Sequence, residues 1–296
     1  MDYQVSELEQ GQRIDLFLMN KMNISRSKVQ KIIKSAGVFV NDTNVKNSFV
    51  VKKDDVVTVD YIEEEIEIKP EKMDLDIVYE DDDVIVVNKD NNVVVHPAVG
   101  NYSGTLVNGL MYYSNTLSSK NGEFRPGIVH RIDASTTGLL MVAKNDYAHE
   151  KLSKQLENKT VHRIYVALVW GVINNDTGTI DAPIGRDLKD RKKMGVTADN
   201  SKEAITHFKV LKRFSNATLI ELKLETGRTH QIRVHMNYIG YPIINDPVYG
   251  RRKVIDNTGQ CLHAKELGFV HPKTNKYMEF TSELPLCFTN ILDKMN

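Results

Sequence analysis

The fold of this chain follows from one stretch, Arg125-Pro126-Gly127-Ile128-Val129-His130-Arg131-Ile132-Asp133-Ala134-Ser135-Thr136-Thr137-Gly138-Leu139-Leu140-Met141-Val142-Ala143-Lys144. Its second half, residues 138–143, is an apolar run without a polar face, which predicts a strand buried on both sides. Pro126 and Gly127 predict a turn before it. The polar residues between the turn and the strand are therefore tied to a core at both ends.

Further strands are predicted around this one. They are rich in β-branched and aliphatic residues and comprise residues 84–87, 164–169, 205–211 and 217–222. Helices are fewer, with residues 147–158 and 229–239 as the clearest cases. This pattern predicts an α+β domain over residues 77–296, with a large mixed or antiparallel sheet and flanking helices.

The first part of the chain predicts a small separate domain over residues 1–62. Residues 11–20 predict an amphipathic helix, and Ser25 is a plausible N-cap for a second helix over residues 26–34. Gly37 ends that helix, and residues 38–41 and 56–59 predict short strands. The expected unit contains two helices and short strands.

Acidic residues dominate the stretch between the two predicted domains, residues 60–83. We expect a solvated linker over residues 63–76, which RNA would repel. The run also explains why the net charge is zero, with 39 Lys and Arg against 39 Asp and Glu. The total charge therefore gives no support for nucleic-acid binding, and any such argument depends on how the charges are distributed.

Composition favours a cytoplasmic protein. The two cysteines, Cys261 and Cys287, form neither a disulfide framework nor a Cys-x-x-Cys metal motif. The first residues show no signal-peptide pattern, and the apolar runs are too short to span a bilayer. We expect no association with a membrane.

Arg131 and Asp133 are two residues apart and would point the same way in an extended backbone. A guanidinium beside a carboxylate favours the charged form of the acid, and a charged aspartate in a cleft can attack carbon or act as a base. A structural ion pair explains the same spacing. The local chemistry leaves both interpretations open.

The N-terminal unit resembles the S4 RNA-binding domain over residues 11–60. The resemblance rests on the helix pair, on the opening Ser25-Arg26-Ser27-Lys28 and on the small strands. It implies phosphate contacts from the basic helix, through Arg26, Lys28, Lys31 and Lys34. Taken alone, such a run of charges is typical of a solvated helix face.

The central segment resembles the signature of pseudouridine synthases of the large-ribosomal-subunit type, in which His-Arg-Leu-Asp precedes a Thr-Ser-Gly-Leu-Leu strand. Here Ile132 replaces the leucine and Thr137 replaces the serine. The resemblance implies that Asp133 is the catalytic aspartate. It also implies that Arg131 helps to hold the opened RNA site.

Three other segments resemble family motifs in the family's order. Residues 86–97 resemble the upstream motif, although Asp90-Asn91-Asn92 stands where the family has Pro-Ala-Gly. Residues 162–171 imply an active-site tyrosine at Tyr165, and residues 222–235 imply an active-site arginine at Arg233. In the last motif we expect Thr229 to cap a helix and place His230 and Arg233 on one face.

Further RNA contacts are expected at the predicted helix entrance, from Arg228 and His230, because helix N-termini favour phosphate. A second basic cluster comprises Arg186, Lys189, Arg191, Lys192 and Lys193, for which a solvated loop is the alternative. A metal site built from His230, His235 and His207 is the rival interpretation. Their spacing converges poorly, so we expect structural histidines and no metal.

The resemblance implies an enzyme that isomerises uridines of a structured RNA, with 23S ribosomal RNA as the expected substrate. No cofactor is implied, because the reaction needs neither an electron carrier nor a group donor, and a monomer is expected. The alternatives are a synthase acting on transfer RNA, a non-catalytic S4-domain RNA-binding protein, and a glycosidase. Glycosidases usually need two carboxylates, and these motifs offer Asp133 alone.

Overall fold

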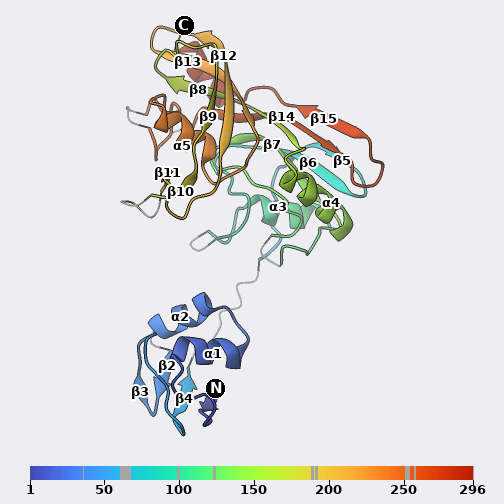
Figure 1. Ribbon diagram of the computed structural model, residues 1–296. Coiled ribbons are helices and arrows are strands. Elements are labelled where there is room, and N and C mark those ends of the chain that lie inside the picture. Colours follow the sequence, from blue (N-terminus) through green and yellow to red (C-terminus); the bar gives the residue numbers. More distant parts are fainter. Residues whose placement is uncertain are drawn as a thin grey trace. The chain divides into compact units, whose positions relative to one another are not determined.

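The computed structural model describes residues 1–35, 37–60, 68–98, 101–122, 125–187, 190, 193–250, 254–256 and 258–295. The chain divides into two compact units, Met1–Ile66 and Glu67–Asn296 (Figure 1). Residues 63–67 of the predicted linker lie outside the described residues. Each unit is described by itself.

The first unit contains two helices and a four-stranded antiparallel sheet of order β1-β4-β2-β3. Its elements are β1 (Asp2–Gln4), α1 (Ile14–Met22), α2 (Arg26–Lys34), β2 (Val38–Val40), β3 (Thr43–Asn44) and β4 (Val56–Val59). Both predicted helices are present, although α1 begins and ends later than residues 11–20. The strands β1 and β3 were not predicted, because two or three residues carry too little periodicity.

Helix α2 forms where the sequence predicts it. The side chain of Ser25 accepts a hydrogen bond from the backbone N–H of Lys28, so the predicted N-cap is confirmed. Val29, Ile32 and Ile33 are buried in the core of the unit, where they pack with apolar residues of α1 and the sheet. The charged residues of α2 are thereby left on its other faces.

The second unit is built on a nine-stranded mixed sheet. The order is β5-β6-β7-β14-β8-β13-β12-β9, and β15 pairs with β14; β7 and β14 are parallel, whereas the other pairs are antiparallel. The strands are β5 (Asp76–Glu80), β6 (Val84–Lys89), β7 (Thr137–Ala143), β8 (His162–Trp170), β9 (Thr177–Asp181), β12 (Ile205–Arg213), β13 (Ala217–Leu224), β14 (Leu262–Val270) and β15 (Tyr277–Thr281). A separate hairpin pairs β10 (Ile184–Arg186) with β11 (Met194–Val196). The predicted α+β class is confirmed.

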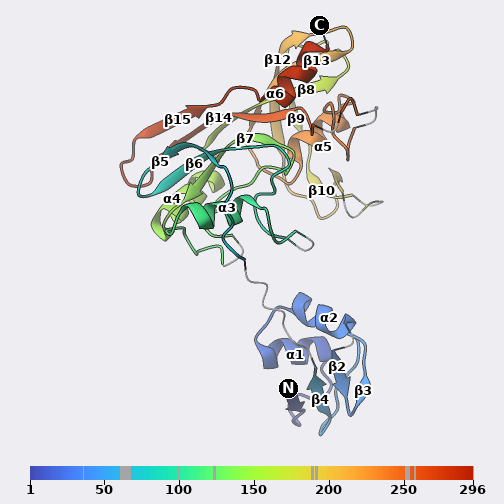
Figure 2. The same cartoon turned by 180° about the vertical axis from the view of Figure 1, so that it is seen from behind.

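Four helices flank this sheet in the described residues: α3 (Leu106–Tyr113), α4 (Asp146–Glu157), α5 (Gln231–Tyr238) and α6 (Leu286–Asp293). Alternate residues of β6 and β7 face opposite ways. One set packs with Leu106 and Leu110 of α3, and the other packs with Ala148 and Leu152 of α4. These two helices therefore cover opposite faces of the same strand pair (Figures 1 and 2).

Strand β7 is buried along its whole length, as the apolar run predicts. Gly138 lies at φ 108°, and a β-carbon there would overlap the backbone of Ala264. The glycine therefore allows β7 to approach β14, whose next neighbour is β8. This arrangement brings the polar segment before β7 close to β8, and so sets the position of the candidate site.

Among the described helices, none combines the length and the apolar character that crossing a bilayer requires.

Candidate active site

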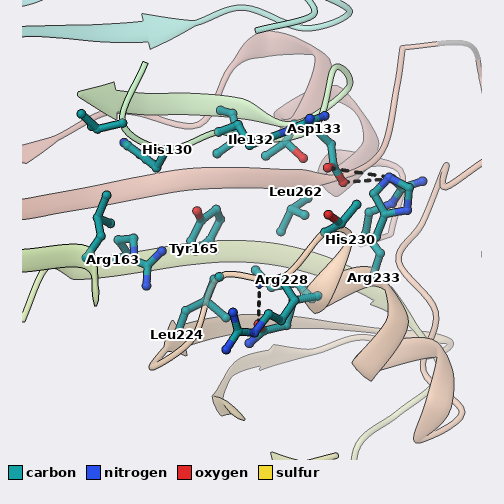
Figure 3. A pocket seen from close by; sticks show the side chains of 18 of the residues that line it. His130, Ile132, Asp133, Arg163, Tyr165, Leu224, Arg228, His230, Arg233 and Leu262 are labelled. Atoms are coloured by element: carbon teal, nitrogen blue, oxygen red, sulfur yellow. Dashed lines mark hydrogen bonds and ion pairs between the residues drawn. The ribbon is translucent and has the colours of Figure 1, made fainter. Parts of the chain in front are cut away.

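A pocket of about 380 Å³ lies in the second unit, and all six residues that the sequence singled out around the motifs line it. They are Arg131, Asp133, Tyr165, Arg228, His230 and Arg233. Figure 3 labels all of these except Arg131. Asp133 comes from the segment before β7, Tyr165 from β8, and Arg233 from the first turn of α5. Segments a hundred residues apart in the sequence therefore meet at one place.

Asp133 is in hydrogen-bond contact with Arg233. Nη1 of Arg233 donates to Oδ2 of Asp133 at 2.9 Å, and the Asp133 side chain keeps 18% of its surface exposed. The other carboxylate oxygen lies 3.9 Å from Nε2 of His230. A carboxylate held by a guanidinium and still open to a pocket can react with a ligand there.

A second carboxylate holds the other side of the same guanidinium. Nε and Nη2 of Arg233 donate to the two oxygens of Asp246 at 2.8 and 2.9 Å. Asp246 is buried, and its Oδ1 also accepts the backbone N–H groups of Val248 and Tyr249. These bonds and the charge of Arg233 keep the pKa of Asp246 below its ordinary value, against the effect of burial.

The ring of Tyr249 lies under Arg233, with 5.0 Å between the guanidinium carbon and the ring centroid. Its hydroxyl accepts from the backbone N–H of Met194 at 3.0 Å and lies 2.8 Å from Nδ1 of His230. This contact holds the imidazole ring with its other nitrogen, Nε2, facing Asp133.

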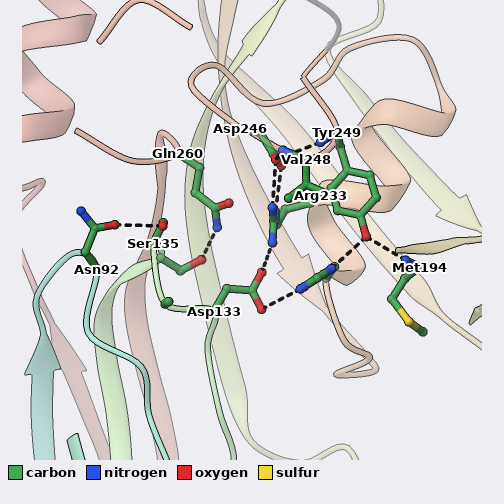
Figure 4. A network of polar contacts seen from close by, with 12 residues as sticks. Asn92, Asp133, Ser135, Met194, Arg233, Asp246, Val248, Tyr249 and Gln260 are labelled. Carbon is green, nitrogen blue, oxygen red and sulfur yellow. Dashed lines mark hydrogen bonds and ion pairs between the residues drawn. The ribbon is translucent and has the colours of Figure 1, made fainter. Parts of the chain in front are cut away.

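Three side chains fix the segment that follows Asp133 (Figure 4). Lys89 Nζ donates to the carbonyl of Ala134 at 2.8 Å, Ser135 donates to Asn92 at 3.0 Å, and Gln260 donates to Thr136 at 2.6 Å. Lys89 is almost fully buried, and burial lowers its pKa to about 7. The backbone that carries Asp133 is thus held by the end of β6 and by two loop residues.

Tyr165 is buried, with 7% of its surface exposed, and its position on β8 makes it a wall of the pocket. Burial raises the pKa of the hydroxyl, because a phenolate loses hydration there. The side chain therefore offers an aromatic face and a protonated hydroxyl at neutral pH. It can pack against a planar ligand.

Arg131 lines the same pocket as Asp133, but its contact is with His96. Its Nη1 is 3.4 Å from Nε2 of His96, and the residue is exposed. Within the described residues, the ion pair of Asp133 is made with Arg233. The two-residue spacing predicts that Arg131 pairs with Asp133. In the structure Asp133 pairs with Arg233 instead, and Asp246 fixes the orientation of Arg233.

The start of α5 corrects a prediction. The helix begins at Gln231, and its N-cap is His230 in the left-handed conformation, at φ 58°; Thr229 is not the cap. The side chain of Gln231 instead holds the turn that precedes the helix. It accepts hydrogen bonds from the backbone N–H of Arg228 at 2.9 Å and from the hydroxyl of Thr226 at 2.8 Å. This turn still directs both His230 and Arg233 towards Asp133.

The predicted RNA-contact residues are distributed over both units. Arg26 is exposed and donates twice to the buried Asp15; Lys31 and Lys34 are exposed, and Lys28 is half-buried. Arg186 ends β10, and Lys193 lies 3.8 Å from Asp190 in an ion pair. Lys189, Arg191 and Lys192 lie outside the described residues. Arg228 donates through Nε to the carbonyl of Glu203.

The rival metal site is wrong. His235 bonds Thr206 and the carbonyl of Ala182, and His207 bonds Thr179 and Glu225, so neither converges on His230.

Among the described residues, a different group lies within ligand distance, Asp81, Asp83 and His271. Nδ1 of His271 accepts the backbone N–H groups of Lys273 and Thr274, so its hydrogen belongs on Nε2, the atom facing Asp81. A protonated nitrogen cannot ligate a cation. In this ring orientation, the group fits an ion pair better than a metal.

The sequence reasoning missed Asp246 and Tyr249. They belong to the segment Asp246-Pro247-Val248-Tyr249-Gly250, where Pro247 suggests a turn. Nothing in the segment shows that the aspartate is buried or that it binds Arg233. Its position two residues after the apolar pair Ile243-Ile244 was the available signal.

Comparisons with known proteins identify the family. The RNA pseudouridylate synthase family model matches residues 83–238, and the S4 domain model matches residues 12–57. The RNA pseudouridine synthase YlyB of Bacillus subtilis (strain 168) is 55% identical over 297 residues, covering 100% of this chain and 98% of the relative. Ribosomal large subunit pseudouridine synthase D of Zymomonas mobilis is 42% identical, covering 93% and 91%.

A solved structure also matches. Human RNA Pseudouridylate Synthase Domain Containing 1 has a TM-score of 0.59 and 25% identity, covering 79% of this chain and 97% of the human chain. The fold, the motif order and the relatives agree, so the chain belongs to the RNA pseudouridylate synthase family and carries an S4 domain before its synthase domain.

Proposed function

We propose that this enzyme converts specific uridines of structured RNA, in 23S ribosomal RNA, to pseudouridine with Asp133 as the catalytic aspartate. The observation that carries the proposal is the position of Asp133, held by Arg233 at 2.9 Å on the wall of a pocket of about 380 Å³. The pocket has the size and the mixed polar and aromatic lining of a small-ligand site.

The isomerisation breaks the C1′–N1 bond, turns the uracil and forms a C1′–C5 bond. The hydrogen on C5 is released, and N1 gains one, so atoms and charge balance without an oxidant or a group donor. Asp133 acts on the nucleotide either as a nucleophile towards C1′ or C6, or as the base that removes a ribose proton. Each route needs a carboxylate next to the sugar–base link.

The other side chains have supporting roles in this proposal. Arg233 orients Asp133, and Tyr165 packs against the uracil. The raised pKa of Tyr165 favours this packing role over removal of the C5 proton. Arg131 is exposed at the pocket and can hold the RNA from which the base has been extruded.

The choice of ribosomal RNA rests on the relatives and on the S4 domain. The relatives from Zymomonas mobilis and Neisseria meningitidis are named ribosomal large subunit pseudouridine synthase D. We propose a cytoplasmic monomer without a cofactor. Its phosphate contacts would be Arg26, Lys28, Lys31, Lys34, Arg186, Arg191, Lys192, Lys193, Arg228 and His230.

Mapping pseudouridines in total RNA tests this directly. A strain that lacks the gene should lose pseudouridine at defined positions of 23S RNA, and wild-type protein should restore them. Asp133→Asn should not restore them, although it keeps the shape of the side chain and the RNA affinity. Loss from transfer RNA alone would contradict the substrate, and restoration by a folded Asp133→Asn protein would contradict the assignment of Asp133.

A further inference from the structure

A positively charged side chain at the far end of the pocket has no role in the proposed reaction. Arg163 lies on β8, two residues before Tyr165, and both line the pocket. Only 7% of Arg163 is exposed. Its Nε has no hydrogen-bond partner among the described residues, and none of the described carboxylates forms an ion pair with it.

This isolation is unusual, because burying a guanidinium without a partner opposes folding. The nearby groups do not relieve it. Nε2 of His130 accepts the backbone N–H of Met141, and burial together with the charge of Arg163 lowers the pKa of His130 to about 3. Glu157 lines the same pocket but is exposed. Nε is itself buried, so the terminal nitrogens Nη1 and Nη2, which form no hydrogen bond with the described residues, are the donors left for an acceptor that arrives with a ligand.

A glycine lies beside the guanidinium in the lining of the pocket. Gly227 faces Arg163, and a β-carbon there would come within 2.9 Å of Nη1. Any other residue at position 227 would press on the guanidinium. The absence of a side chain at position 227 therefore keeps the donors accessible from the pocket.

The order of side chains along the pocket indicates which part of the nucleotide arrives at Arg163. In Figure 3, Tyr165 lies between Arg163 at one end and Asp133 with Arg233 at the other. Asp133 must meet the sugar–base link. Residues two apart on a strand are about 7 Å apart, so a uracil that packs on Tyr165 directs its far edge to Arg163.

We propose that Arg163 is a specificity residue that donates to the O4 carbonyl of the target uracil. This inference rests on the proposed function. A guanidinium has donors and no acceptor, so it suits O4 of uracil and repels the N4 amino group of cytosine. A buried site that must hydrogen-bond its ligand rejects analogues that lack the partner group.

Two variants separate this role from a structural one. Arg163→Met removes the donors and keeps the apolar stem, and Arg163→Lys keeps the charge but loses the planar fork. We expect Arg163→Met to lower kcat/KM at least tenfold, while its unfolding midpoint stays equal to the wild type or rises, because an unpaired buried charge is removed. Arg163→Lys should be little more active than Arg163→Met.

The matched control is Arg213→Met. Arg213 donates to the carbonyls of Ile173 and Asn174 and to Asp176, and it does not line the pocket. Its loss should lower the unfolding midpoint and leave kcat/KM unchanged. A fall in the midpoint of Arg163→Met, with activity recovered below that temperature, would show that Arg163 is merely structural and would overturn the proposal.

An atomic substitution tests the carbonyl itself. Synthetic RNA spanning a mapped position carries either uridine or 4-thiouridine at the target, since sulfur accepts hydrogen bonds weakly. Wild-type enzyme should discriminate between the two in single-turnover assays, and Arg163→Met should lose that discrimination. Equal discrimination by both proteins would overturn the proposal.

A phosphate partner would give a different result. Loss of a phosphate contact reduces the slope of log Kd against log salt by about one. We expect the slope to be unchanged in Arg163→Met, and a reduced slope would contradict a base contact. If the wild-type protein forms no pseudouridine, the proposed function fails; if it does and Arg163→Met matches it, this inference alone fails.

Discussion

The buried carboxylate of Asp246 accepts two hydrogen bonds from Arg233, at 2.8 and 2.9 Å, and so turns the remaining donor of that guanidinium towards Asp133. One arginine thus joins a fully buried acid to an acid that faces the pocket. The Tyr249 ring beneath it closes a third side. The orientation of Asp133 therefore depends on a residue that does not line the pocket.

Asp246→Asn should damage activity and stability together. The change leaves the buried Arg233 with a neutral partner, and breaking a buried pair costs about 3–5 kcal/mol. We expect a lower free energy of unfolding in urea, and a fall in kcat of about a hundredfold from loss of positioning. Asp176→Asn is the matched control, because Asp176 is exposed and pairs with Arg213. An Asp246→Asn protein with wild-type kcat would exclude a positioning role.

Tyr249→Phe should separate the ring from its hydroxyl. The ring under Arg233 remains, but the contacts to Met194 N–H and to His230 Nδ1 are lost. We expect a loss of about 1 kcal/mol in stability. Activity should fall several-fold, because the His230 ring loses the hydrogen bond that holds its Nε2 towards Asp133. Activity equal to wild type across pH 6–8 would show that the orientation of His230 does not matter.

Lys89→Met should change how stability depends on pH. Burial lowers the pKa of Lys89 to about 7 in the folded protein, against 10.5 for an ordinary lysine. Between these values the unfolded chain holds a proton that the folded chain has released, so wild-type stability rises with pH through this window. The contribution has an upper limit of about 1.4 kcal/mol per pH unit.

Urea unfolding at pH 6, 7, 8 and 9 measures this effect as the difference between the wild type and Lys89→Met. That difference should shift in favour of the wild type as the pH rises. Lys144→Met is the control, because Lys144 pairs with Glu80 at the surface of the sheet. A difference that is constant over this range would contradict the lowered pKa.

Asp15→Asn should weaken the first unit and spare the chemistry. Asp15 is fully buried and accepts from Arg13, Arg26 and Gln30, and these bonds hold its pKa well below the ordinary value although burial opposes them. We expect a loss of roughly 1–3 kcal/mol in the stability of this unit. Affinity for long RNA should fall because Arg26 loses its anchor.

The readout for Asp15→Asn is RNA binding by titration beside kcat on the same RNA at saturation. A higher Kd with unchanged kcat is the expected result. A parallel fall in kcat would show that the S4 unit takes part in the catalytic step itself.

Strong local signals predicted the principal elements. The apolar runs of β7 and β8, the strand patterns of β12 and β13, and the Ser25 cap of α2 can each be recognised from neighbouring residues alone. Elements that are short, or that depend on pairing with distant residues, were not predicted. Strand β1 has three residues, and β14 depends on β7 for its parallel partner, which no local pattern reveals.

The sequence by itself determined the family motifs, the two-unit plan and the polar segment that carries Asp133, because these depend on residue type and short spacing. Only the tertiary structure decided that Arg233 rather than Arg131 contacts Asp133, and that Asp246 and Tyr249 hold Arg233. It also decided that Arg163 is buried with no hydrogen-bond partner for its Nε among the described residues. The physical reason is that these contacts join residues far apart in the chain. Their geometry is set by strand order and packing, which the spacing of residues along the chain does not record.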